Sequence, residues 1–385
     1  MWGTECRVSR KKRRGDPMGK DSAPEKWVME PHTKVKHEIL NDYLGAWYPI
    51  LSKWNGRVLY IDGFAGRGRY DDGSEGSPQL ALRRLLTHRH FPNMTKCEFV
   101  FVFIEKDSDN CDALKGELEV LKEEFAPWPS NVKPYVINGS FDDEMNRLLQ
   151  AVREQNSRLA PTFAFVDPFG YTRFPMELLA GIASTPKSEL LINFMVGFVQ
   201  RFITRDHQEK PISALYGMKV DEVLKRYEEG GDRIDYLVDV YADALREKAQ
   251  LPHIQRFYMV NRTGNVSYAL IHATANKLGV QRMKAALWKV DPGGSNRFSD
   301  RSHGEVVLFE PQPDLMRLEK LILAHFSGRR AVSRETVNWF AVLETPYRET
   351  HVIPVLKELE KVGRIAVARP VGKKGFGEGV TFDFV

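Results

Sequence analysis

The chain has 385 residues, with 56 Lys or Arg against 51 Asp or Glu, so its formal net charge is +5. The first twenty residues hold seven basic and two acidic side chains, and that local excess of five accounts for the whole net charge. A neutral remainder excludes a polybasic surface over the whole protein, so any nucleic-acid binding would need local patches.

Hydropathy and cysteine content exclude further classes of protein. No apolar run approaches the ~18 residues of a membrane span, and the N-terminus lacks the apolar stretch of a signal peptide. The three cysteines, Cys6, Cys97 and Cys111, are not clustered, which argues against a disulfide framework or a structural zinc site. We therefore expect a soluble, cytoplasmic protein of two or three domains.

Alternating apolar runs and helical stretches follow a polar, basic leader. Residues 1–26 lack periodicity, so we expect disorder there; Met18 is an alternative start, and the leader is either a solvated tail or a nucleic-acid arm. From Lys34 to Ile50 apolar residues recur at steps of three and four, which predicts a helix. The strands predicted next are 58–61, 98–104, 135–137, 162–166 and 189–195, and the helices between them are 78–86, 109–125, 141–154 and 175–183.

This alternation predicts an α/β fold. Five apolar strands separated by helices indicate a parallel sheet covered on both faces. Residues 197–250 are mostly helical and polar, and we expect a helical insert that is either a solvated cap or a contact for a nucleic-acid strand. Strands 256–260 and 267–273 then flank a turn and predict an antiparallel hairpin. Five parallel strands with such a hairpin are typical of the Rossmann-like class I S-adenosylmethionine-dependent methyltransferase fold, which we expect over residues 27–311, although other α/β folds are compatible.

A second domain is expected at residues 312–385. Its predicted helices are 315–326, 333–343 and 349–362, with Ser333 at an N-terminus and Gly363 just past a C-terminus. Strands 365–368 and 380–384 flank a glycine-rich basic turn, and this order predicts a winged helix. Between Arg329 and Lys374 there are ten basic and five acidic residues, so the domain either contacts nucleic acid or serves as a protein–protein module.

The first candidate site is the turn after the first predicted strand, Asp62-Gly63-Phe64-Ala65-Gly66-Arg67-Gly68. Ligands of open α/β sheets bind at the carboxyl ends of the strands, where Gly66 and Gly68 let the backbone approach closely. The spacing differs from the dinucleotide GxGxxG. An acid followed by GxxGxG suits S-adenosyl-L-methionine, which has no phosphate to cradle; a structural turn is the alternative.

Two further strand ends carry polar residues that could meet a cofactor. Glu105 ends the second strand, where a carboxylate accepts from a ribose diol in related sheets. Asn138-Gly139 ends the third, where a polar side chain could meet an adenine edge. A solvated surface position is the alternative for each.

The end of the fourth strand, Asp167-Pro168-Phe169-Gly170-Tyr171, is the sharpest candidate. Asp167 can accept a hydrogen bond from an exocyclic amine and hold it in line with a methyl donor. An aromatic side chain nearby can stack on a planar base. A charged strand end followed by a turn is the alternative.

Several motifs in order resemble the three-Cys-motif partner family, TcmP. They are Leu59 to Gly66, Gly76-Ser77-Pro78, Asp167 to Tyr171, Leu191 to Met195 and Arg282 to Trp288, and the resemblance covers about residues 30–385. It implies a methyltransferase-like domain of unestablished substrate. It also implies a functional pairing with a three-cysteine-motif protein suspected of iron–sulfur, radical-adenosylmethionine chemistry.

The methyltransferase half is also similar to bacterial ribosomal-RNA adenine methyltransferases that act on the exocyclic amine. This likeness implies an amine held by Asp167 and Pro168, and cofactor contacts from Asp62, Gly66, Gly68, Glu105 and Asn138, with Lys36 as a further candidate. Those enzymes have a second proline where this chain has Phe169, and an aromatic residue where it has Gly170. Stacking would therefore pass to Phe169 or Tyr171.

The function predicted is a methyltransferase that transfers a methyl group directly from S-adenosyl-L-methionine to a nucleic-acid base amine. Gly63, Phe64 and Gly139 complete the expected cofactor-binding residues, and no metal is expected. One alternative is a non-catalytic adaptor that binds a partner or nucleic acid through its winged helix. Another is phosphate-ester hydrolysis by a metal held at Asp62 and Asp167.

Overall fold

The computed structural model describes residues 27–225, 232–300 and 312–384. The predicted disorder of residues 1–26 and the alternative start at Met18 lie outside the described residues. None of the helices within the described ranges is long and apolar enough to cross a membrane.

The larger domain is built on an eight-stranded sheet in the order β3-β2-β1-β4-β5-β7-β6-β8. Strands β1 to β5 run parallel, β7 is antiparallel to β5 and β6, and β8 pairs parallel with β6. The bounds are β1 Arg57–Asp62, β2 Glu98–Glu105, β3 Val132–Asn138, β4 Thr162–Val166, β5 Glu189–Phe194, β6 His253–Val260, β7 Val266–Thr274 and β8 Arg297–Ser299. Five parallel strands and the late hairpin confirm the predicted Rossmann-like class I methyltransferase fold. The edge strand β8 was not predicted, because three residues are too few for a periodic pattern.

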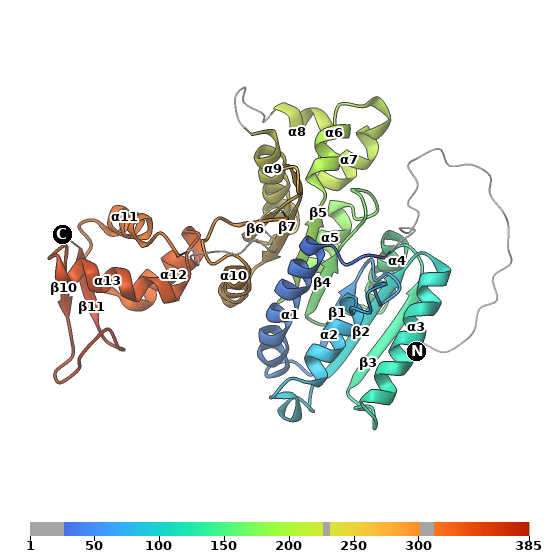
Figure 1. The fold of residues 1–385 in the computed structure, drawn as a ribbon, viewed down its shortest axis with the longest axis horizontal. Helices are drawn as coiled ribbons and strands as arrows, with labels where there is room; N and C mark the ends of the chain where they lie inside the picture. Colours follow the sequence, from blue (N-terminus) through green and yellow to red (C-terminus); the bar gives the residue numbers. More distant parts are fainter. Residues whose placement is uncertain (1–26, 226–231, 301–311, 385) are drawn as a thin grey trace.

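Helices cover both faces of this sheet (Figure 1). One face carries α1 Pro31–Ser52, α2 Ser77–Leu86, α3 Ser108–Glu124 and α10 Lys277–Val290, and the other carries α4 Phe141–Glu154, α5 Met176–Ala183 and α9 Arg233–Lys248. Strand β1 supplies both cores: Val58 and Tyr60 pack on the first face, and Leu59 and Ile61 on the second. Burial on both faces is why these strands read as continuous apolar runs.

The region expected to be a helical insert contains helices and no strand among its described residues. They are α6 Val196–Phe202, α7 Glu209–Tyr216, α8 Val220–Lys225 and α9, with a short 3₁₀ turn η2 at Asp206–Gln208. The interpretation of the whole region as a solvated cap is wrong for α9. Leu237, Tyr241 and Leu245 are fully buried, and the Tyr241 ring stacks on Phe194 of β5 at 4.3 Å between centroids. Helix α9 is therefore part of the layer that covers the sheet.

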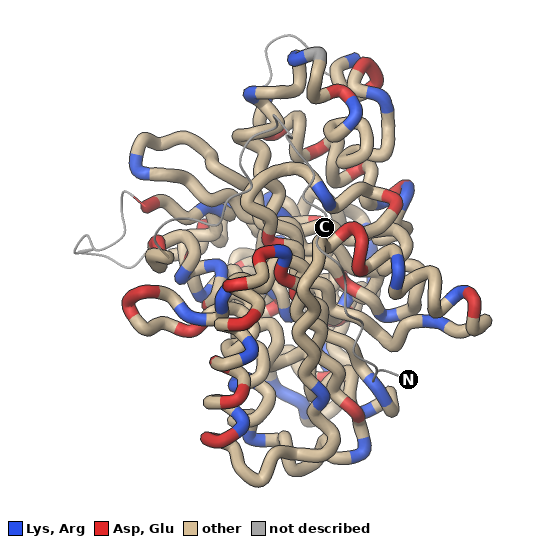
Figure 2. The backbone as a smooth tube through the Cα atoms, turned by 90° about the vertical axis from the view of Figure 1, so that its right-hand side faces the viewer, with Lys and Arg blue, Asp and Glu red and all other residues tan. Residues whose placement is uncertain are grey.

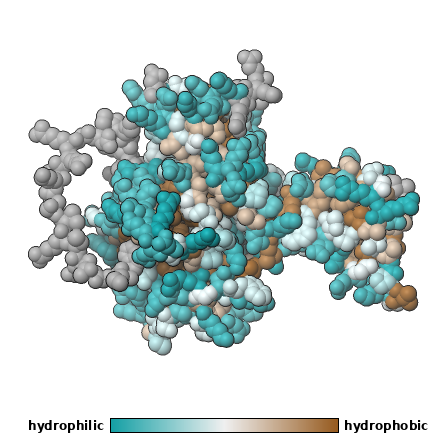
Figure 3. All heavy atoms as spheres, turned by 180° about the vertical axis from the view of Figure 1, so that it is seen from behind, coloured by the Kyte–Doolittle hydropathy of each residue, from teal (hydrophilic) through white to brown (hydrophobic). Residues whose placement is uncertain are grey.

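The C-terminal domain is a separate lobe with its own core (Figures 1 and 3). It comprises α11 Leu315–Phe326, α12 Arg334–Glu344, a 3₁₀ turn η3 at Glu349–His351, α13 Val352–Lys361 and the antiparallel strands β9 Val332–Ser333, β10 Ile365–Ala368 and β11 Thr381–Phe384. The Ser333 hydroxyl accepts from the Thr336 N–H at 3.1 Å, and Gly363 has φ 72°, so both predicted caps are present. The order of three helices and a hairpin is as predicted, whereas the assignment to the winged-helix class stays a prediction.

Candidate functional site

Two cavities lie at the carboxyl ends of the parallel strands. The main cavity, of about 1050 Å³, is lined by parts of α1, the glycine turn after β1, the segment after β4, the end of β5 and the β6–β7 turn. The side cavity, of about 190 Å³, lies between that glycine turn and the ends of β2 and β3. Phe64, Pro168 and Phe169 line both cavities. The structure thus brings the two sharpest sequence candidates, after β1 and after β4, to one place.

The glycine turn depends on close backbone contacts. Gly66 has φ +63°, and a Cβ there would lie 2.8 Å from the indole of Trp27. A Cβ on Gly76 would lie 2.7 Å from the carbonyl oxygen of Gly68. The same oxygen accepts a hydrogen bond from the Gly76 N–H at 2.6 Å. The glycines therefore fold the turn tightly on itself and on the N-terminal segment.

Asp62 is fully buried beneath this turn. Its Oδ1 accepts from the Phe64 N–H at 3.3 Å, and its Oδ2 has no hydrogen-bond partner within the described ranges. Burial raises the pKa of Asp62 from 3.8 to about 7, and the nearby charge of Asp167 adds to the rise. A buried carboxylate oxygen without a partner is an acceptor available to a cationic ligand group.

Glu105 links two loops at the mouth of the side cavity. Its carboxylate accepts from the Gly66 N–H at 2.8 Å and from the Asp107 N–H at 2.7 Å. Burial raises the pKa of Glu105. Asn138, by contrast, turns away: its Nδ2 donates to the carbonyls of Glu105 and Lys106 at 3.0 and 3.2 Å, and it lines neither cavity. Asn138 thus holds the loop after β2, while Gly63 and Gly139 line the side cavity.

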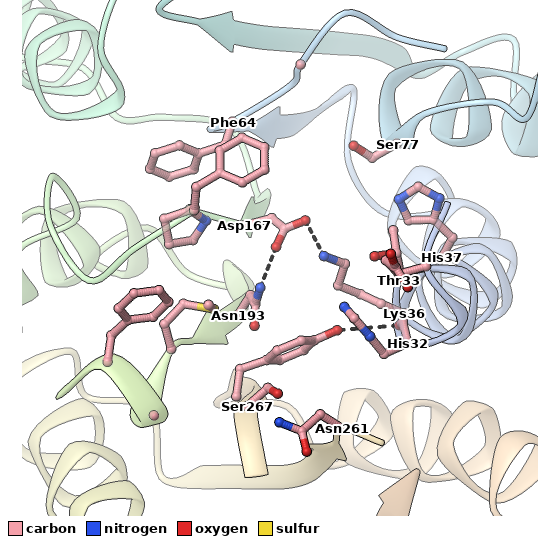
Figure 4. Close-up of a pocket in the computed structure, with 18 of the residues that line it drawn as sticks. His32, Thr33, Lys36, His37, Phe64, Ser77, Asp167, Asn193, Asn261 and Ser267 are labelled. Carbon is pink, nitrogen blue, oxygen red and sulfur yellow. Dashed lines mark hydrogen bonds and ion pairs between the residues drawn. The ribbon is translucent and has the colours of Figure 1, made fainter. Parts of the chain in front are cut away.

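Asp167 is the polar centre of the main cavity (Figure 4). One carboxylate oxygen forms an ion pair with the ammonium of Lys36 in α1, and the other accepts from Asn193 Nδ2 at 2.6 Å. Lys36 is buried, with its Nζ 5.7 Å from the centroid of the Tyr268 ring. Next to it, burial and the charge of Lys36 lower the pKa of His37 to about 4, so this imidazole is neutral at pH 7. Three elements, α1, β4 and β5, thus meet at one carboxylate.

Aromatic rings form the walls around this centre. Phe169 is 61% exposed, which is unusual for so apolar a side chain, and its ring meets that of Trp27 edge-on at 6.1 Å. On the side-cavity wall, Phe64 packs on Phe141 at 5.6 Å between centroids. Planar ligands can therefore be accommodated on both sides of the glycine turn.

Tyr171 does not join the site. It is buried, its hydroxyl donates to Gln208, and its ring lies 6.0 Å from that of Phe202. Tyr171 lines neither cavity. The expectation that stacking would pass to Phe169 or Tyr171 is therefore wrong for Tyr171, because the chain turns after Phe169 and points the tyrosine under α6.

Sequence reasoning missed Trp27, Asn193 and Tyr268. A signal existed for Asn193, because this amide interrupts the apolar run of β5 after Leu190, Leu191 and Ile192. Nothing in the sequence pointed to Trp27, because it stands in a polar stretch. It contacts Tyr70 and Phe169, which are distant in sequence, only in the folded chain. Within the described ranges, no group of three or more His, Cys, Asp or Glu side chains is placed to hold a metal ion.

Comparisons with known proteins give weak similarity. No known family profile matches the chain, and no curated protein matches it. Solved structures that are similar include human methyltransferase-like protein 13 in complex with SAH, with 14% identity over 66% of this chain and 90% of that one and a TM-score of 0.32. Geranyl diphosphate C-methyltransferase from Streptomyces coelicolor has 12% identity over 68% and 88% of the two chains, with a TM-score of 0.25. Spermidine synthase from Thermotoga maritima has 13% identity over 62% and 60%, with a TM-score of 0.26. Because these identities and TM-scores are so low, the fold is assigned from the strand order of the sheet.

Proposed function

We propose that this chain is an S-adenosyl-L-methionine-dependent methyltransferase that acts on the amine of a nucleic-acid base. The observation that carries the proposal is one cavity of about 1050 Å³ that joins the glycine turn after β1 to Asp167-Pro168-Phe169 after β4. Methyl transfer needs a donor and an acceptor held in line, and a cavity of this kind can hold both. The fold places it where open α/β sheets bind their ligands.

The residues around the glycine turn fit this cofactor. The unpartnered Oδ2 of Asp62 suits the ammonium of its amino-acid part, and Glu105 keeps lone pairs for a ribose hydroxyl. The paired rings of Phe64 and Phe141 beside the side cavity suit a planar adenine. When bound, S-adenosyl-L-methionine supplies an electrophilic methyl group.

The residues of the main cavity fit a base amine. Phe169 and Trp27 offer faces and edges against which a planar base can stack. Asp167, which forms an ion pair with Lys36, offsets the positive charge that grows on the amine nitrogen. In this proposal these residues position the base and exclude water. The methyl group then passes directly to the amine, and no nucleophilic side chain is needed. A base in a duplex would first be flipped out of the stack.

A non-catalytic adaptor is the second candidate, and one observation favours it. Both carboxylate oxygens of Asp167 already accept from protein donors, Lys36 and Asn193. In an adaptor, these contacts would be a purely structural link between α1, β4 and β5.

Cofactor binding and methyl transfer distinguish the two. Isothermal calorimetry of the wild type with S-adenosyl-L-methionine tests cofactor binding. Absence of binding would reject the proposed methyltransferase function. Asp167→Ala is expected to keep cofactor affinity while methyl incorporation into total cellular RNA and DNA falls by about 100-fold or more. Asp221→Ala, at an exposed position of α8, is the matched control and is expected to match the wild type. Incorporation unchanged in Asp167→Ala would remove that residue from the mechanism.

We further infer, from the resemblance to the TcmP family alone, that the chain works with a three-cysteine-motif protein. The test is reciprocal affinity purification of the two proteins from the same cells, followed by the methyl-transfer assay with and without the partner. Separate elution of the two and transfer that is independent of the partner would remove this inference.

A further inference from the structure

Asn193 is a polar residue between two apolar neighbours in β5. It lies one residue before the end of β5, between Ile192 and Phe194, which are completely buried, and is itself only 4% exposed. It lines the main cavity. A buried amide in the centre of a sheet costs free energy unless its donors and acceptor find partners. Each polar atom of Asn193 is therefore expected to have a hydrogen-bond partner.

The orientation of the amide follows from Asp167. Asp167 Oδ1 lies 2.6 Å from Asn193 Nδ2, and an ionised carboxylate only accepts hydrogen bonds. The nitrogen must therefore face Asp167, and the oxygen must point away from it, as Figure 4 shows. That oxygen has no hydrogen-bond partner among the residues that the structure describes.

Asp167 is fixed in turn by Lys36. The Lys36 ammonium is buried and forms an ion pair with Asp167 Oδ2, and it also lies over the face of Tyr268. The ion pair holds the Asp167 carboxylate in place, and this carboxylate accepts from Asn193 Nδ2 and so holds the amide in one orientation. Lys36, Asp167 and Asn193 thus form one chain of contacts that ends in a buried oxygen without a partner among the described residues, on a side chain that lines the main cavity.

We propose that Asn193 Oδ1 accepts the hydrogen bond from the target amine, and that Asp167 acts as a positioning residue behind it. This inference rests on the proposed methyltransferase function and assigns a substrate contact within it. One N–H of the amine points to the amide oxygen, which turns the nitrogen lone pair toward the methyl donor. The transfer forms an N–C bond and breaks an S–C bond, so the sulfonium becomes a neutral thioether and the amine gives up one proton to solvent water. The amide oxygen therefore selects a ligand that donates, an amine, over one that presents a carbonyl.

Binding of homopolymers tests this selection directly. The probes are single-stranded poly(A) and poly(C), which carry exocyclic amines, and poly(I) and poly(U), in which a carbonyl replaces the amine. With S-adenosylhomocysteine present, the wild type is expected to bind the better amine polymer about tenfold more tightly than its carbonyl counterpart. Asn193→Ala is expected to bind both members of that pair equally, and to lower methyl transfer by about 100-fold. A purely structural role for Asn193 would not change the ratio within a pair.

Two further variants keep the test decisive. Asn193→Asp retains an oxygen at the cavity but loses the donor to Asp167, and we expect part of the amine preference to survive in it, which covers the case that Asn193→Ala does not fold. Asn55→Ala removes an amide that bonds to the Leu51 carbonyl at the opposite end of the sheet, and it is expected to behave as the wild type. A wild type without preference for either amine polymer, or an unchanged preference in Asn193→Ala, overturns the inference. Failure of the wild type to bind cofactor or to transfer methyl groups would instead reject the proposed function itself.

Discussion

A fully buried carboxylate at the end of β1 couples the protonation of Asp62 to the stability of the larger domain. Its pKa rises from 3.8 to about 7 on folding because burial penalises the charged form. Between these values the folded protein holds a proton that the unfolded chain has lost. The stabilising contribution of Asp62 is therefore complete below pH 4 and is lost as the pH rises through 7.

We expect Asp62→Asn, which cannot ionise, to remove this dependence. The variant should match the wild type in unfolding free energy near pH 4 and exceed it by a few kcal/mol at pH 8, as measured by urea denaturation without ligand. The gain should come with weaker S-adenosylhomocysteine binding, because the anion is lost. Asp112→Asn, on the exposed face of α3, is the control. Parallel stability profiles for Asp62→Asn and wild type would contradict the prediction.

At the scale of elements, one lysine of α10 holds the end of α12. Lys284 is buried, and its Nζ donates to the carbonyls of Ala341 at 3.4 Å, of Thr345, and of Tyr347 at 3.3 Å. Burial lowers the pKa of Lys284 to about 7. Helix ends leave carbonyls without intrahelical partners, and here a side chain from the other domain satisfies them. Trp288 Nε1, one turn further along α10, donates to the Pro346 carbonyl at 3.0 Å and adds to the same junction.

Lys284→Met should loosen this junction while nearly conserving volume. Because buried carbonyls lose their donor, we expect the unfolding free energy to fall by about 1–3 kcal/mol in urea denaturation. Lys289→Met is the matched control on the same helix: its ion pair with Asp42 is exposed on the lysine side, and such pairs contribute about 0–1 kcal/mol. Equal losses in the two variants would show that Lys284 does not hold the domains together.

At the scale of the whole molecule, the charge is distributed without a dominant sign. Figure 2 shows basic and acidic segments interspersed along the described tube. In the C-terminal domain, the Arg369 guanidinium forms a two-pronged pair with Glu360 at 2.7 Å, and Lys361 pairs with Glu358 at 3.2 Å. These pairs occupy two of the ten basic side chains between residues 329 and 374 and leave the local excess of five unchanged. Arg330 and Lys374 are exposed and are candidates to contact the phosphates of a nucleic acid.

The nucleic-acid role of the C-terminal domain can be tested by its salt dependence. Arg330→Glu combined with Lys374→Glu should weaken RNA or DNA binding and reduce the slope of log K against log salt by about 2 units, from two phosphate contacts. Lys115→Glu with Lys122→Glu, on the exposed side of α3, is the charge-matched control. If both pairs change the slope equally, binding follows net charge and the domain has no specific part in it.

Sequence patterns alone specify the sheet and the edge at which chemistry could occur. Strands buried on both faces are mostly apolar, so β1, β2 and β4 were visible as apolar runs and β5 as a run that Asn193 interrupts. The carboxyl ends of parallel strands meet at one edge, so the sequence alone predicts that Asp62 and Asp167 lie close together. The caps at Ser333 and Gly363 were likewise readable, because they depend on local backbone geometry.

Which side chains complete the site depends on how the elements pack in the folded chain. Trp27 contacts Phe169 from a position 142 residues earlier in the chain, while Tyr171, two residues from Phe169, is turned into the core. The contacts that join Lys36, Asp167 and Asn193 arise from three separate elements, and no periodicity or spacing encodes them. Helix α9 was read as a polar cap because its outward face is charged, whereas its buried face became visible only against β5 and β7. Local patterns specify which elements form, but the partner of a buried polar atom depends on packing between residues that are distant in sequence.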